Sequence, residues 1–207
     1  MAFDPRVFRD TLGHYASGIT IISGIDDGGP IGFTCQSFYS VSTEPPLVSF
    51  SVMTNSTTYP RLRGTGKFAV NVLAHNQDAV SNQFARKGTD KWAGIDWSQT
   101  EASNPVIADT LMWLDCDIWA EHEAGDHYIV IGRVNEMSPA SWHKEEPLLY
   151  FKGKYRWPSN LKPKHVTQTC QESIKATDRT GHRTGMPKYC QSPQRMSARA
   201  NCPIANQ

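Results

Sequence analysis

The sequence lacks long hydrophobic runs and has no clear excess of one charge. None of its apolar stretches approaches the roughly 18 to 20 residues that span a bilayer as a helix, and residues 1–6 begin no secretory signal. The formal net charge over 207 residues is +1, whereas proteins that neutralise many nucleic-acid phosphates need a clear basic excess. We therefore expect a cytoplasmic protein that binds neither membranes nor nucleic acid.

Cysteines are few and badly placed for cross-links. The five are Cys35, Cys116, Cys170, Cys190 and Cys202. An odd number at wide spacing, with no C-x-x-C pair, is a poor disulfide framework. Metal-ligand spacing with histidine is missing too. We therefore interpret them as reduced thiols and expect no metal site.

Several catalytic motifs are also missing. No G-x-G-x-x-G follows an expected strand, so a nicotinamide cofactor is not held by a Rossmann fingerprint. No G-x-S-x-G nucleophile elbow occurs. The stretch 64–67 has only part of a phosphate-binding loop and leads into an expected strand, where that loop requires a helix. The sequence therefore gives no support for a Rossmann-type dinucleotide site, a phosphate-binding loop or a nucleophile-elbow hydrolase.

The composition changes near residue 157. The whole chain is 39% hydrophobic and 20% charged, which suits one globular core. Residues 1–156 hold 13 basic and 18 acidic side chains, whereas residues 157–207 hold 8 basic and 2 acidic ones. The second segment has few large apolar residues and no periodic pattern, so we expect it to be mostly disordered.

The sequence thus predicts a domain over 1–156 and a basic tail over 157–207. The tail could bind an acidic partner or nucleic acid, which would make the chain an interaction protein. We favour a solvated extension without a function of its own, and expect the function to lie in residues 1–156.

The first part is expected to be mainly β with short helices. Asp4 and Pro5 predict a helix running to about residue 15, with Phe3, Val7, Phe8 and Leu12 on one face. Two further helices are expected over 59–63 and 76–87. Apolar, β-rich runs predict strands over 19–23, 31–34, 46–53, 67–73, 112–122, 127–137 and 147–151. Because strands and helices do not alternate regularly, a barrel is favoured over a doubly wound sheet.

Polar residues gather at the ends of these strands. They form four clusters, over 34–42, 51–58, 84–87 with Lys91, and 125–127. Hydroxyls beside a helix start can seat a phosphate, which nearby cations would neutralise. The same residues also suit helix capping, and a lone histidine is often structural. Spacing alone leaves both interpretations open and identifies no catalytic acid or base.

The order of the motifs resembles that of the flavin reductase-like family. The resemblance is carried by Gly32-Phe33-Thr34-Cys35-Gln36-Ser37-Phe38, by the stretches 40–48, 68–73 and 92–95, by Gly125-Asp126-His127 and by Gly153-Lys154-Tyr155. It covers residues 8 to 156. Within the family, the chain is most similar to the small reductase components of two-component, flavin-dependent aromatic (phenol-type) monooxygenases.

This resemblance implies a split β-barrel and a definite activity. Members form homodimers with flavin near the subunit interface. The chain would use NADH or NADPH to reduce FMN or FAD, and the reduced flavin would pass to a separate oxygenase that hydroxylates an aromatic substrate. A flavin-binding protein of the same barrel without reductase turnover is the alternative. A haem or pyridoxal-type protein on a related barrel is a further one.

The resemblance also assigns roles to residues, although no catalytic residue is expected because hydride passes directly between cofactors. The first cluster would contact the flavin ring and ribityl chain, the second the ribityl and phosphate end, and the third would supply phosphate cations. The implied flavin-binding residues are Thr34, Cys35, Gln36, Ser37, Ser51, Val52, Asn55, Ser56, Thr57, Thr58, Phe84, Ala85, Arg86 and Lys91. His127 would bind the nicotinamide, with Tyr155 beside the same cleft. A reactive-thiol role for Cys35 is not expected.

Overall fold

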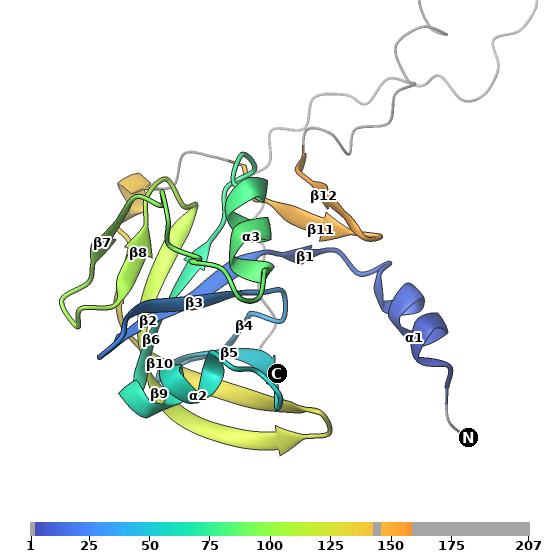
Figure 1. Ribbon diagram of the computed structural model, residues 1–207, viewed down its shortest axis with the longest axis horizontal. Coiled ribbons are helices and arrows are strands. Elements are labelled where there is room, and N and C mark those ends of the chain that lie inside the picture. The colour runs from blue at the N-terminus through green and yellow to red at the C-terminus, as the bar shows by residue number, and fades with distance from the viewer. Residues whose placement is uncertain (1–2, 143–145, 159–207) are drawn as a thin grey trace, which may run out of the picture. The chain divides into compact units, whose positions relative to one another are not determined.

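The computed structural model describes residues 3–142 and 146–158 (Figure 1). Apart from Trp157 and Pro158, the predicted tail lies outside the described residues. The helices are α1 (Pro5–Leu12), α2 (Tyr59–Thr65), α3 (Asp78–Ala85) and the 3₁₀ turn η1 (Ala140–Trp142). The strands are β1 (Ser17–Gly18), β2 (Thr20–Asp26), β3 (Gly29–Cys35), β4 (Tyr39–Thr43), β5 (Pro46–Met53), β6 (Lys67–Val72), β7 (Trp97–Gln99), β8 (Pro105–Ile107), β9 (Met112–Ala124), β10 (His127–Met137), β11 (Leu149–Phe151) and β12 (Lys154–Arg156). The prediction of a mainly β fold with short helices is confirmed.

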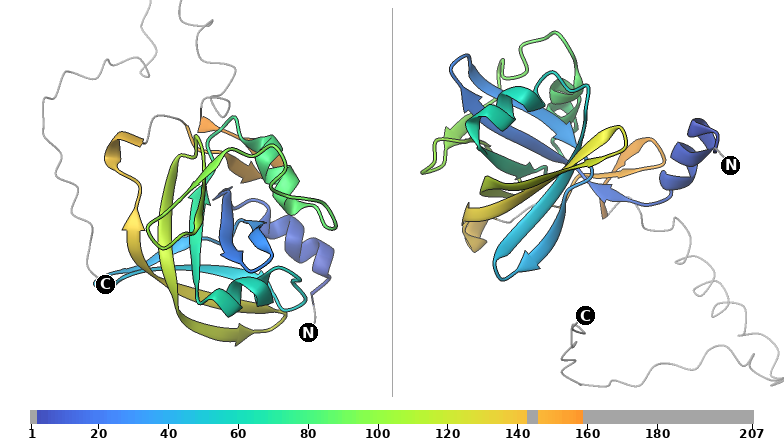
Figure 2. Two further views of the ribbon diagram at one scale, coloured as in Figure 1. Left: turned by 60° about the vertical axis from the view of Figure 1, so that its left-hand side comes forward. Right: turned by 90° about the horizontal axis from the view of Figure 1, so that it is seen from below.

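Seven strands form one antiparallel sheet in the order β3-β2-β6-β9-β10-β5-β4. This sheet curls until β3, at one edge, approaches β5 near the other edge (Figure 2). Ser37, just after β3, closes the gap. Its hydroxyl donates to the Ser51 carbonyl oxygen (3.1 Å) and accepts from the Ser51 N–H (2.7 Å). We call this pair of hydrogen bonds the Ser37–Ser51 seam.

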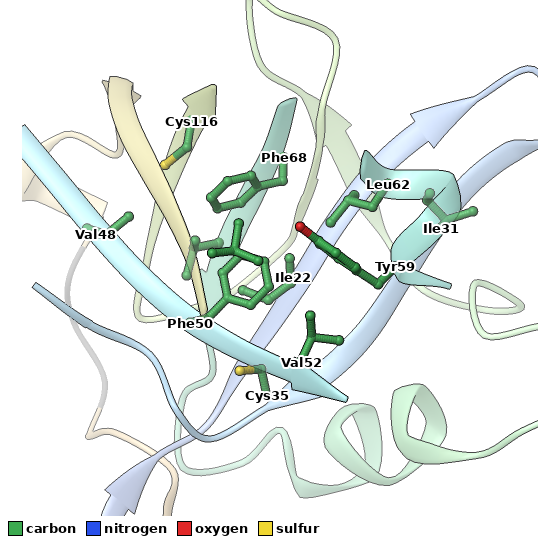
Figure 3. Close-up of a cluster of buried hydrophobic side chains, with 12 residues drawn as sticks. Ile22, Ile31, Cys35, Val48, Phe50, Val52, Tyr59, Leu62, Phe68 and Cys116 are labelled. Carbon is green, nitrogen blue, oxygen red and sulfur yellow. The ribbon is translucent and has the colours of Figure 1, made fainter. Parts of the chain in front are cut away.

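The main core fills the inside of the curled sheet (Figure 3). Phe50 lies at its centre, with ring centroids 6.0 Å from Phe33 and 5.2 Å from Phe68. Gly132 of β10 packs directly on Phe68, and a Cβ built at Gly132 would lie 2.4 Å from the Phe68 ring. This strand can therefore cross the ring only because residue 132 has no side chain.

A second core lies between the sheet and α3. It contains Ile19, Ile21, Leu73, Phe84, Ile107 and Leu148, with Val80 packed against it. Val80 and Phe84, from one face of α3, thus meet Leu73 in this core. α3 covers one end of the sheet, beside the small three-stranded sheet β1-β11-β12 (Figure 1).

α1 begins where the sequence predicts but does not join the core. The Asp4 carboxylate caps it by accepting from the Arg6 N–H at 2.7 Å, and the helix ends at Leu12, one turn earlier than expected. Its apolar residues stay exposed: Val7 retains 61% of its accessible surface and Leu12 56%, and Phe3, just before the helix, retains 79%. α1 stands away from the sheets in Figure 1 and in the right-hand view of Figure 2. No helix among the described residues is long and apolar enough to cross a membrane.

Candidate functional site

A cavity of about 460 Å³ opens beside the Ser37–Ser51 seam. Its walls come from the end of β3, the end of β5, the segment leading into α2, the end of α3 and the start of β10. The lining residues are Phe33, Thr34, Cys35, Gln36, Ser37, Ser51, Val52, Met53, Asn55, Ser56, Thr57, Thr58, Phe84, Ala85, Lys87, Lys91 and His127. The cavity therefore gathers residues from segments almost one hundred positions apart.

The structure brings nearly all of the sequence-predicted site residues to this cavity. Every residue predicted for flavin lines it except Arg86, and His127 lines it too. Phe33, Met53 and Lys87 line it as well, although they are not among the residues implied to bind flavin; Met53 and Lys87 lie within the polar clusters 51–58 and 84–87. The four polar clusters of the sequence are thus parts of one site.

One wall depends on a close approach of α3 to β3. A Cβ built at Gly32 would lie 2.8 Å from the Phe84 ring, so the glycine lets this ring rest on the strand. The Thr34 hydroxyl donates to the Ser81 carbonyl oxygen at 2.7 Å. Lys91 reaches over the strand and donates to the Gly32 carbonyl oxygen at 3.1 Å. Partial burial lowers the pKa of the Lys91 amine.

The residues of the Ser37–Ser51 seam line the cavity, and two of the lining hydroxyls, those of Ser37 and Thr34, are already engaged in hydrogen bonds. The Ser37 hydroxyl donates its hydrogen bond to the Ser51 carbonyl oxygen, and the Thr34 hydroxyl donates to the Ser81 carbonyl oxygen. Neither hydroxyl can therefore donate to a ligand. Cys35 lies in the core beneath them, with its sulfur 3.3 Å from the Ser37 hydroxyl (Figure 3). Burial raises the pKa of the Cys35 thiol, so the reactive thiolate is disfavoured.

Other polar side chains of the lining are available to a ligand. Among residues 3–142 and 146–158, no hydrogen-bond partner is found for five of them, namely the side chains of Gln36, Ser51, Asn55, Thr57 and Thr58. Ser56 differs, because its hydroxyl accepts from the Tyr59 N–H at 3.1 Å and so begins α2. Pro60 then offers no N–H in the first turn of α2. The hydrogen-bonding groups that this wall offers to a ligand are therefore mainly side-chain groups, not the N–H groups of the first helical turn.

His127 enters the cavity from a tight hairpin. Gly125 takes φ +65°, which lets β9 turn into β10 across Gly125 and Asp126. The turn is fastened to the end of β5, because the Asp126 carbonyl oxygen accepts from the Thr54 N–H at 2.9 Å. His127 Nδ1 lies 2.7 Å from the Asp126 carboxylate, and this hydrogen bond holds the pKa of Asp126 below its usual value. The pair orients the imidazole and leaves Nε2 for a ligand.

Two predicted residues lie elsewhere. Arg86 follows the end of α3 and is exposed, while its neighbour Lys87 lines the cavity. Tyr155 lies in β12, and its hydroxyl is 3.0 Å from Ser81 Oγ and 2.8 Å from Asn82 Oδ1. Tyr155 thus holds α3 from behind and does not belong to the lining.

Comparison with known proteins agrees with this geometry. Residues 12–159 match the model of the flavin reductase-like domain. The reductase subunit HsaB of a flavin-dependent monooxygenase from Mycobacterium tuberculosis is 42% identical over 164 residues, covering 79% of this chain and 86% of that protein.

Solved structures give the same result. Nitrilotriacetate monooxygenase component B from Mycobacterium thermoresistibile is 37% identical, with a TM-score of 0.73 over 78% of this chain and 90% of that one. The NADH:FAD oxidoreductase SgcE6 of Streptomyces globisporus, in complex with NAD and FAD fragments, is 33% identical, with a TM-score of 0.69 over 75% of this chain and 95% of that one.

The curled sheet and its cavity define the split-barrel class of flavin-binding proteins, as the sequence predicts. Within that class, the chain belongs to the flavin reductase-like family.

Proposed function

We propose that this chain is an NAD(P)H-dependent flavin reductase that supplies reduced FMN or FAD to a separate flavin-dependent monooxygenase acting on an aromatic substrate. The carrying observation is one cavity, in a chain of this family, that combines unengaged amide and hydroxyl groups, two lysines and His127. The relatives support the proposal, since one is the reductase subunit of a monooxygenase and another an NADH:FAD oxidoreductase.

The lining fits a flavin along its length. Phe33, Val52 and Phe84 provide apolar surface for a ring, and the Gln36 amide provides donors and an acceptor at its edge. Ser51 and Asn55 suit the ribityl hydroxyls. Thr57, Thr58, Lys87 and Lys91 suit a phosphate. Arg86 precedes Lys87 in the chain and lies outside the lining, so it is proposed only as a more distant cation. These assignments rest on the chemistry of the donor groups.

His127 is proposed to hold the nicotinamide cofactor. Its Nδ1 is bound to Asp126, so Nε2 can contact the carboxamide or diphosphate of that cofactor. Tyr155 contributes indirectly, by fixing α3 through Ser81 and Asn82. When both are bound, the dihydronicotinamide and the flavin supply the hydride transfer themselves. The described residues position the two rings and need supply no acid, base or nucleophile.

A homodimer is proposed on the exposed apolar surface. The face of α1 that carries Phe3, Val7, Phe8 and Leu12 is unpartnered within the described residues, and Trp119 on β9 remains 54% exposed. A second copy can cover such surfaces and so stabilise the pair. Sedimentation should give twice the mass of the chain; a monomer at micromolar concentration would contradict this part of the proposal.

Location and domain division are proposed on separate grounds. The two described cysteines, Cys35 and Cys116, are free thiols, which suits the reducing cytoplasm. The family match ends at residue 159, which supports placing the activity in residues 1–156 and none of it in the tail, 157–207.

Oxidation of NADH and NADPH, with and without added FMN or FAD, tests the proposal. Purified protein should oxidise a reduced nicotinamide only when flavin is present. Flavin binding without turnover would favour the non-catalytic flavin-binding protein. A cavity variant, Val52→Trp, should lower turnover because it fills the space for the ring, whereas an exposed change such as Ser40→Ala should not.

A further inference from the structure

A second cavity, of about 290 Å³, adjoins the first. Four residues line both: Thr57, Thr58, Lys87 and Lys91. The rest of its wall comes from the β2–β3 turn, from α2 and from the segment after α3. These further lining residues are Gly28, Pro30, Ile31, Gly32, Arg61, Gly88, Thr89, Asp90 and Trp92. The two cavities therefore meet at a pair of threonines and a pair of lysines.

The second cavity carries a surplus of positive charge. Arg61, Lys87 and Lys91 line it, against Asp90 in the lining and Asp26, which lies outside the lining and pairs with Arg61, so one positive charge remains in excess. In the part of the chain that the structure describes, no carboxylate lies within ion-pair distance of Lys87 or Lys91. A polar cavity with this charge suits a phosphate-bearing ligand.

Arg61 is fixed in position at the wall. Its Nε and Nη2 donate to the two carboxylate oxygens of Asp26 at 2.6 and 2.7 Å. The guanidinium holds the pKa of the Asp26 carboxyl below its usual range. A Cβ built at Gly28 would lie 3.1 Å from Arg61 Nη2, so the glycine gives the arginine room against the β2–β3 turn. Nη1 takes no part in this ion pair and remains for a ligand.

We infer that the second cavity binds the adenosine diphosphate end of FAD, so that this chain uses FAD in preference to FMN. The inference rests on the proposed function, because it takes the first cavity as the flavin site. FMN ends at one phosphate, for which the shared threonines and lysines suffice. FAD continues with a second phosphate and adenosine, for which Arg61 supplies charge and Trp92 an aromatic surface.

The adenosine diphosphate part of the nicotinamide cofactor has the same chemistry, so the test must separate the two sources. Two variants change only the second cavity. Arg61→Gln removes its fixed cation, and Thr89→Glu places a negative charge in its wall. Thr89→Gln is the matched neutral control. Arg63→Gln is the control on α2, because Arg63 pairs with Glu121 at 2.9 Å and lines neither cavity.

Calorimetric titration of the full chain with FAD, FMN and NAD⁺ provides the measurement. The wild type should bind FAD at least about tenfold more tightly than FMN, because one charge-assisted hydrogen bond contributes enough free energy for a tenfold change in the dissociation constant. Arg61→Gln and Thr89→Glu should remove most of this preference and leave the dissociation constant for FMN unchanged, while both controls keep the preference.

Three results would overturn the inference. They are equal affinity of the wild type for FAD and FMN, equal weakening of both flavins by the two variants, and weakening of NAD⁺ alone. Failure of both flavins to bind is a distinct outcome, because it contradicts the proposed flavin site itself and the inference with it.

Discussion

Replacing Ser37 by alanine should weaken the barrel at the seam beneath the cavity. β4 pairs with β5 only as far as Tyr39 opposite Ser49, so it does not reach Ser51. The Ser37 hydroxyl serves both main-chain groups of Ser51, at 3.1 and 2.7 Å. Ser37→Ala removes both hydrogen bonds, and each contributes roughly 0.5–1.5 kcal/mol net.

The free energy of unfolding should therefore fall by about 1–3 kcal/mol, which in a chain of this size lowers Tm by roughly 2–12 °C. Flavin affinity should fall as well, because Ser37 and Ser51 both line the cavity. Urea unfolding, with and without flavin, measures both effects on one sample.

Two controls isolate the seam. Ser37→Thr keeps the hydroxyl, so its free energy of unfolding should lie between those of the wild type and the alanine variant. Ser40→Ala makes the same chemical change at an exposed position of β4 and should leave unfolding unaffected. If Ser37→Ala unfolds at the same urea concentration as the wild type and binds flavin equally well, the seam does not close the barrel as described.

Four further predictions concern single features. His127→Ala should raise KM for the nicotinamide more than it weakens flavin binding; equal loss of both with the fold intact would remove His127 from the nicotinamide site. Burial raises the pKa of Asp115, so its ionisation should lower stability as pH rises above about 4 towards the folded-state pKa. Asp115→Asn should abolish that decline, so at about pH 8 its free energy of unfolding in urea should be higher than that of the wild type. A variant less stable than the wild type at both about pH 5 and about pH 8 would contradict this. Gly132→Ala should cost roughly 1–3 kcal/mol because its Cβ would meet Phe68 at 2.4 Å, whereas Gly18→Ala, with nothing within 4 Å, should be neutral; similar costs at both sites would count against the packing argument. Deleting residues 159–207 should leave flavin-dependent NADH oxidation intact, and its loss from a folded protein would place function in the tail.

The long strands were predictable from their residues. β5 and β10 have the expected bounds, because both are apolar runs rich in β-forming residues. β4 was missed, because its five residues include only two large apolar side chains, Tyr39 and Val41, among three hydroxyl residues. The short strands β7, β8 and β12 were missed as well, because three residues carry no period. The helix expected over 76–87 is shorter in the structure, ending at Ala85.

The cavity lining followed from the family resemblance more than from spacing. The curl of the sheet places Ser37 beside Ser51, which no local pattern of the sequence shows. The Ser37 hydroxyl then donates to Ser51 and the Thr34 hydroxyl donates to Ser81 of α3, which hydroxyl content alone does not reveal. The helix α3 ends at Ala85. Which of the two following cations, Arg86 or Lys87, lines the cavity therefore depends on the direction that the chain takes after the helix. Lys87 lies beyond the helix and follows the extended Arg86, so helical spacing gives no signal for this choice.

Anaerobic mixing of NADH with flavin, with and without this protein, tests the central claim most directly. We predict that the flavin absorbance is bleached as NADH is oxidised, one flavin per NADH, and far faster with the protein than without it. If a folded preparation binds flavin but leaves it oxidised in the presence of NADH and of NADPH, the chain is not a flavin reductase.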